Sequence, residues 1–252
     1  MDLPVISAED AYRGEIGRER AAFCADFLKG KPAAFERIRR EIFAQIAAKG
    51  ERPTCHAGCP ACCVMYVQAD IREAEAIVYH LYQHPERLAS FAERFGLWGE
   101  RMRQMGEPYR TVEAILREQR EGEATQAERE KLLAVMLRYH EAAIPCAFLV
   151  GGSCGIYTAR PFACANHYVT TPGEWCRPER WLDTANPQKP RVYLTDVPEI
   201  GGLTFYHGTL ARPVIGFMQV MVHRILTGGL DYVAAATGIR ALTPVRFAKR
   251  DT

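Results

Sequence analysis

Apolar residues recur at helical spacing through the first half of the chain. Phe35, Ile38, Ile42 and Ile46 follow one another at intervals of three and four residues, so they share one face of a helix that ends before Gly50. A second stripe has the same spacing and consists of Leu88, Phe91, Phe95, Trp98 and Met102. Both patterns predict amphipathic helices whose apolar faces are turned toward a core.

Two capping pairs mark the starts of two more helices. Asp70 precedes Glu73 by three residues, and Thr125 precedes Glu128 by three, which is the spacing of a capping box. The apolar faces that follow are Ile71, Ala74, Val78 and Leu81 after the first pair, and Leu132, Leu133, Met136 and Leu137 after the second. Pro85 ends the first of these helices because the residue before a proline avoids helical backbone angles.

Between residues 142 and 190 the helical period disappears, and glycine and proline punctuate the chain. Gly151 and Gly152, flanked by residues 148–150 and 156–157, predict a short β-hairpin, and residues 191–197 alternate as a strand does. A last helix is predicted at residues 213–226, before a glycine pair. The expected fold is mainly α, with an irregular cysteine-rich segment and a short β-hairpin, in a single domain of 252 residues.

Composition excludes several classes of protein. The 32 basic and 30 acidic residues are mixed along the chain, so no charged patch for nucleic acid is expected. The first ten residues have neither a basic nor an apolar leader region, and polar residues interrupt the apolar stretch at 213–226. We therefore expect a cytoplasmic protein that is neither exported nor inserted in a membrane. In that reducing compartment, nine cysteines indicate metal binding or redox chemistry before disulfides.

Four cysteines crowd into nine residues, at Cys55, Cys59, Cys62 and Cys63. Thiolates repel one another, so a group this dense is stable when a cation or cluster neutralises it. Cys63 is the least certain ligand of the four, because adjacent side chains rarely reach the same metal. Buried cysteine also serves as a small apolar residue, and this is the interpretation for Cys24, which lies alone in a helical run.

A second group of cysteines is spread through the irregular segment. Cys146, Cys154, Cys164 and Cys176 each lie beside or within a few residues of a proline or glycine, a setting typical of ligands on shaped loops. Their intervals match no zinc knuckle. Coordination by a metal would explain how a stretch so rich in loops becomes ordered, although each of these cysteines could also be a buried apolar residue.

The combined pattern resembles a known family. Cys-x3-Cys-x2-Cys-Cys at residues 55–63 is followed by a cysteine in Pro-Cys-x-Phe-Leu at 145–149, by Cys-x-Ile-Tyr at 154–157, by Arg160-Pro161 and by Cys164. This is similar to the YkgJ-type cysteine-cluster family, a zinc- or iron-chelating CxxCxxCC domain. The resemblance covers residues 55–176, roughly half the chain, with a helical insertion at about 70–141. It implies that all eight cysteines of the two groups are the ligand set, with Cys176 the weakest member, and it implies no reaction.

Thiolate ligands suit zinc and iron–sulfur clusters alike. One pair, Cys59 and Cys62, has the C-x2-C spacing of structural zinc sites. The Cys-x3-Cys-x2-Cys start instead resembles the loop that holds a four-iron cluster in radical enzymes, so a 4Fe-4S cluster is favoured over zinc. His56 and His167 are candidate ligands or donors to sulfur, or else ordinary loop histidines. Arg160 is a candidate to offset the negative charge of the centre, or else makes an ordinary ion pair.

Two functions from different classes follow. One is an iron–sulfur protein with redox or protein-modifying activity, supported by a similarity of the cysteine pattern to that of flagellin lysine N-methylases. The other is a non-enzymatic zinc-chelating module that holds a fold together or buffers metal. A protein or small-molecule partner is expected, but the residues do not identify it.

Overall fold

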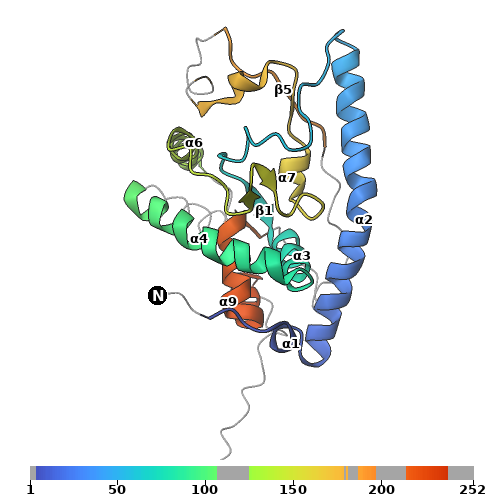
Figure 1. Ribbon diagram of the computed structural model, residues 1–252, viewed down its shortest axis with the longest axis vertical. Helices are drawn as coiled ribbons and strands as arrows, with labels where there is room; N and C mark the ends of the chain where they lie inside the picture. The colour runs from blue at the N-terminus through green and yellow to red at the C-terminus, as the bar shows by residue number, and fades with distance from the viewer. Residues whose placement is uncertain (1–3, 107–124, 179, 181–186, 197–213, 238–252) are drawn as a thin grey trace, which may run out of the picture.

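Helix α2 (Gly14–Ala47) runs along one whole side of the molecule and follows a short helix α1 (Ala8–Ala11) (Figure 1). The computed structural model describes residues 4–106, 125–178, 180, 187–196 and 214–237. As the apolar spacing predicts, Ile38, Ile42 and Ile46 are buried, and they pack with Phe162 and Tyr193 from the irregular segment. The long helix is therefore the support against which the second half of the chain is laid.

The centre of the core is helix α3 (Ile71–Tyr82), which packs against α2, α4 (Pro85–Met105) and α9 (Met218–Thr237). The predicted capping box of Asp70 and Glu73 is present, and Pro85 stands in the first turn of α4. Helix α6 (Gln126–Glu141) begins with the predicted box of Thr125 and Glu128. The mainly α fold is confirmed.

The last predicted helix begins in the wrong place. Of the predicted range 213–226, residue 213 lies outside the described residues, and strand β6 (Ile215–Phe217) occupies the next positions. It pairs antiparallel with β1 (Gln68–Asp70), with Gln68 opposite Phe217. Strand β6 supplies hydrogen-bond partners for the backbone N–H and C=O groups of β1. This pairing joins distant parts of the chain, so the local sequence does not reveal it. The predicted stop at the glycine pair is present, because Gly229 takes the non-helical angles φ 49° and ψ −135° and breaks α9 into two helical stretches across a kink.

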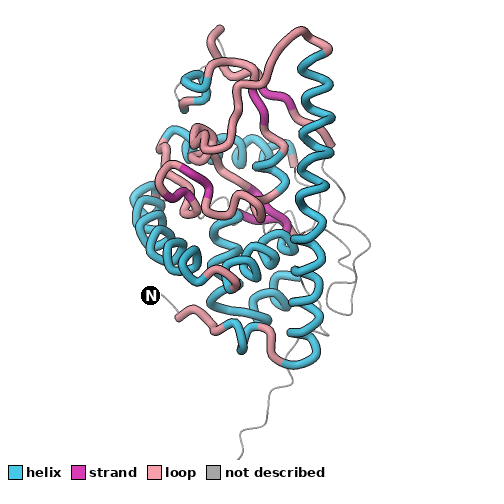
Figure 2. Tube along the Cα trace, turned by 45° about the vertical axis from the view of Figure 1, so that its right-hand side comes forward, coloured by secondary structure: helices cyan, strands magenta, loops and turns pink. Residues whose placement is uncertain are grey.

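The segment after α6 is irregular, as predicted, with short elements of two to four residues. These are β2 (Leu149–Val150), β3 (Ser153–Cys154), α7 (Phe162–Ala165), β4 (Tyr168–Val169), the 3-10 helix η1 (Gly173–Cys176) and β5 (Val192–Tyr193). Figure 2 shows the pair of β4 and β5 beside the upper part of α2, while other short strands lie farther from that helix.

The hairpin has a different second strand from the predicted one. Gly151 and Gly152 both have positive φ, 55° and 79°, and so form a two-residue turn that pairs the residues next to it. Strand β2 therefore pairs with β3 and not with residues 156–157. Of the predicted strand at 191–197, only residues 192–193 form a strand, β5, which pairs with β4, and residue 197 lies outside the described residues. Over the described ranges, no helix is both long and apolar enough to cross a membrane.

Candidate metal centre

The first cysteine group lies in a loop between α2 and β1 that turns back on itself repeatedly. The amide of Cys59 donates to the carbonyl of His56 at 3.2 Å, and the amide of Cys63 donates to that of Pro60 at 2.8 Å. Gly58 adopts a φ of 87°, which L-residues rarely take. These tight turns bring the four thiols of the loop toward the same side.

Backbone hydrogen bonds join this loop to the second cysteine group at both of its ends. The amide of Cys146 donates to the carbonyl of Cys63 at 2.7 Å. At the other end, the amide of Thr54 donates to the carbonyl of Val169 at 2.9 Å, and the amide of Val169 donates to the Sγ of Cys55 at 3.3 Å. Residues far apart in the sequence are thereby held side by side.

Seven of the eight predicted cysteines line one cavity of about 330 Å³, which we call the thiol cavity. They are Cys55, Cys59, Cys62, Cys63, Cys146, Cys154 and Cys164. The predicted residues His56, His167 and Arg160 line the same cavity. Cys176 is outside this lining but close to it: its pKa is raised to about 11, chiefly by burial and in part by the charges of Cys55 and Cys59.

Cys62 is the electrostatic centre of the group. Its pKa is lowered to about 7, chiefly by the hydrogen bond from Cys63 and against the effect of burial, with help from Arg160. The same hydrogen bond raises the pKa of Cys63. The pKa of Cys146 is raised to about 12 and that of Cys164 well above its usual value, in both cases chiefly by burial and in part by the charge of Cys62. Without a cation most of these groups stay protonated, so the site is suited to a strongly positive centre.

Arg160 has a donor that the described residues leave unused. Its Nε is buried and has no hydrogen-bond partner among them, while the guanidinium lies 3.9 Å from the ring centroid of Tyr157. The positive charge of Arg160 lowers the pKa values of Cys62, Cys55 and Cys154. A buried donor beside thiolates fits a centre whose total charge is negative, as thiolate-ligated clusters are.

The two histidines have different settings. His56 is exposed, and its Nδ1 lies 3.2 Å from the carbonyl oxygen of Thr54. His167 is more enclosed, and its pKa is lowered by burial and by the charge of His140. A neutral imidazole is the form that binds metal or accepts a hydrogen bond. His167 is therefore the better placed of the two to act on the thiol cavity.

Lys31 is a site residue that the sequence reading missed. Its Nζ is fully buried and donates to the carbonyls of Ala159 and Arg160 at 2.8 and 2.6 Å. Glu73 lies 3.7 Å away and accepts from the amide of Phe162 at 2.8 Å. Helices α2 and α3 thus fix the turn that carries Arg160. The sequence does contain a sign of its burial: Lys31 lies four residues from both Phe27 and Phe35, on an apolar face of the helix.

Cys24 takes no part in this centre. It is wholly buried in the helical core, and burial raises its pKa, with a further contribution from the charge of Glu75. The interpretation of Cys24 as an apolar packing residue is confirmed.

The thiols lie around the wall of the cavity instead of meeting at a point. In the part of the chain that the structure describes, no group of three or more His, Cys, Asp or Glu side chains is arranged to hold a metal ion. All nine cysteines are described, and none forms a disulfide. Comparison of the chain with protein-family models, with curated proteins and with solved structures gave no match in any of the three.

Proposed function

We propose that the protein binds an iron–sulfur cluster in the thiol cavity and acts in redox or protein-modification chemistry. One observation carries the proposal. Seven thiols from two distant segments surround a single cavity of about 330 Å³ that also contains Arg160. Crowded buried thiolates carry a large electrostatic cost that a metal centre removes, whereas ordinary packing gives no reason to collect so many cysteines.

The spread of the thiols favours a cluster over a single ion. Zinc requires four ligands around one point, with each sulfur about 2.3 Å from the metal. The described side chains show no such grouping. A four-iron cluster contributes several iron and sulfide atoms of its own, so its cysteine ligands do not have to meet at a single point. The Cys-x3-Cys-x2-Cys spacing of Cys55, Cys59 and Cys62 supports the same choice.

A bound cluster supplies one-electron transfer, whose potential depends on net charge, hydrogen bonds to sulfur and exposure to solvent. The chain supplies the proposed ligands of the cluster, a hydrogen-bond donor near them and an apolar wall. Cys55, Cys59 and Cys62, with further thiols from the second group, are the proposed ligands, and Arg160 is placed to donate toward sulfur. Phe148, Ile156 and Met218 provide apolar wall and keep water from part of the cavity. Unpaired thiols throughout fit the reducing cytoplasm.

The second candidate is a non-enzymatic zinc-chelating module. The C-x2-C spacing of Cys59 and Cys62 favours it, as does the scarcity of regular structure around both cysteine groups, because a metal can order such loops. In this case metal binding has a structural role and no electron is transferred.

Purification without oxygen tests the two candidates. A brown protein that contains iron and acid-labile sulfide, with broad visible absorption, supports the cluster, and a colourless protein with stoichiometric zinc rejects it.

Replacing Cys59 and Cys62 together by alanine should remove most of the bound metal. Cys24→Ala is the matched control, because Cys24 lies in the core away from the cavity. Equal metal content in the double variant and the control would contradict the proposed site.

A further inference from the structure

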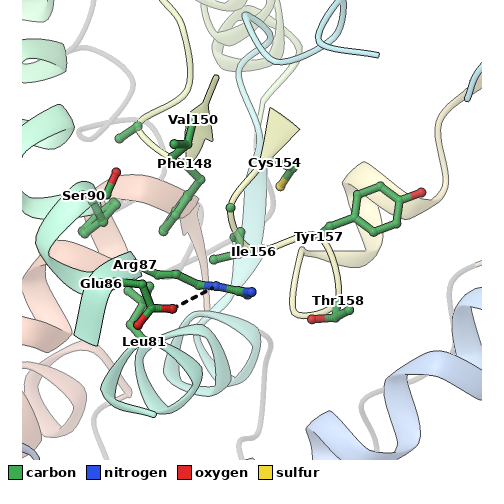
Figure 3. A pocket seen from close by; sticks show the side chains of 13 residues that line it. Leu81, Glu86, Arg87, Ser90, Phe148, Val150, Cys154, Ile156, Tyr157 and Thr158 are labelled. Atoms are coloured by element: carbon green, nitrogen blue, oxygen red, sulfur yellow. Dashed lines mark ion pairs between the residues drawn. The ribbon is translucent and has the colours of Figure 1, made fainter. Parts of the chain in front are cut away.

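A second cavity of about 330 Å³ lies between helix α4 and residues 147–158. Figure 3 shows Phe148 and Ile156 turned into it from one side, opposite Leu81, Glu86 and Arg87 (Figure 3). Most of its wall is apolar, and its charged groups are the neighbours Glu86 and Arg87. Concave sites of this size, mainly apolar and with few polar groups, are typical of small-molecule binding. We call it the Arg87 cavity.

The Arg87 cavity shares a wall with the thiol cavity. Phe148, Cys154, Ile156 and Tyr157 line both. The guanidinium of Arg87 is near enough to Cys154 to lower the pKa of its thiol, although burial raises that pKa by more. A molecule in the Arg87 cavity would therefore lie against Cys154 and close to the other thiols.

The guanidinium of Arg87 is held in place by two polar contacts that leave some of its N–H donors without a partner among the described residues. Its Nη1 lies 2.9 Å from the Nε2 of His80, and its Nε makes a longer ion pair of 3.6 Å with the exposed carboxylate of Glu86. Exposed pairs of this kind contribute little free energy, so a ligand can replace the Glu86 contact at small cost. Within the described residues these are the polar contacts of the guanidinium, which has five N–H donors in all. Donors therefore remain for a ligand.

We propose that the Arg87 cavity binds a small molecule with an apolar body and a single carboxylate. The apolar body would lie against Phe91, Phe148 and Ile156, and the carboxylate would accept hydrogen bonds from Arg87. One arginine beside one glutamate suits a monoanion better than a dianion such as a phosphate. That this molecule is the substrate rests on the proposed function, whereas its binding does not depend on what fills the thiol cavity.

Calorimetric titration with octanoate tests the binding, with octylamine and octanol as probes of the same apolar length. We expect octanoate to bind more tightly than either. Arg87→Gln should weaken octanoate binding at least about tenfold, since it removes charge-assisted hydrogen bonds. Arg101→Gln, on the exposed face of the same helix, is the matched control and should bind as the unaltered protein does. Ser90→Phe, which fills the cavity and keeps Arg87, should also abolish binding.

Failure of octanoate to bind, octylamine or octanol binding as tightly as octanoate, or an affinity in Arg87→Gln equal to that of the control would each overturn the proposal. Iron and sulfide are measured on the same samples, which separates the two ideas. Octanoate binding to protein without iron and sulfide would reject the cluster and leave the Arg87 cavity standing. Protein that contains iron and sulfide but does not bind octanoate would support the cluster and reject the proposed ligand of the Arg87 cavity.

Discussion

At the scale of single residues, burial decides which groups near the two cavities carry charge. It raises the pKa values of Cys146 and Cys164, so these thiols keep their protons unless a cation displaces them. It lowers the pKa of Lys31 to about 8, against the attraction of Glu73. Binding of a metal at the proposed centre would therefore displace protons from these thiols, and it should strengthen as the pH rises.

His80 should make the fold sensitive to acid. Burial, with the charges of His84 and Arg87, lowers the pKa of His80 from 6.5 to about 4. Between these values the folded protein holds fewer protons than the unfolded chain, so the free energy of unfolding falls as the pH is lowered from 6.5 toward 4. The contribution of His80 is on the order of 3 kcal/mol at most.

His80→Gln keeps a hydrogen-bond acceptor near Arg87 and removes the titrating group. Urea unfolding at several pH values in that range should give a shallower loss of stability in the variant than in the unaltered protein. Equal slopes in the two proteins would show that His80 does not titrate as the structure indicates.

At the scale of elements, the contact that joins α2, α3 and the Arg160 turn depends on a buried ion pair. Removing one partner of such a pair leaves a buried charge and costs roughly 3–5 kcal/mol. Lys31→Met should therefore lower the free energy of unfolding by about that amount in urea titrations. Lys29→Met, exposed on the same helix, should change it by less than about 0.5 kcal/mol. Equal midpoints for the two variants would mean that Lys31 does not support the turn.

The elements that could be predicted from sequence are those that depend on local signals. The capping boxes at Asp70 and Thr125 and the apolar spacing in α2 and α4 lie within a few residues of the structure that they predict. Strand β6 could not be found in this way, because its partner β1 lies far away in the sequence.

The candidate site likewise could be predicted only in part from the sequence. Cysteine density predicted a common centre, but the hydrogen bond from Cys146 to Cys63 and the place of Lys31 exist only in the folded chain.

At the scale of the whole molecule, the helical core and the cysteine loops differ in what holds them together. Helices α3 and α9 bury residues such as Ile77, Leu81 and Val222 almost completely, and this burial does not involve the thiols. The loops at 51–67 and 142–178 have few elements longer than four residues. They are tied to each other by backbone hydrogen bonds at Cys63 and Val169 and by side-chain hydrogen bonds of Thr54 and Thr170.

Removal of the proposed metal centre should therefore loosen the loops and spare the core. After treatment with a chelator, we expect faster amide hydrogen exchange at Thr54, Cys146 and Val169, whose amides join the two loops. Amides of α3 and α9 should keep their protection, because local opening follows the regions with the weakest support. The double Cys59→Ala, Cys62→Ala variant should show the same pattern without chelator, and Cys24→Ala should not. Equal loss of protection in α3 and in the loops would mean that the metal holds the whole fold, and unchanged exchange in the loops would mean that no metal holds them.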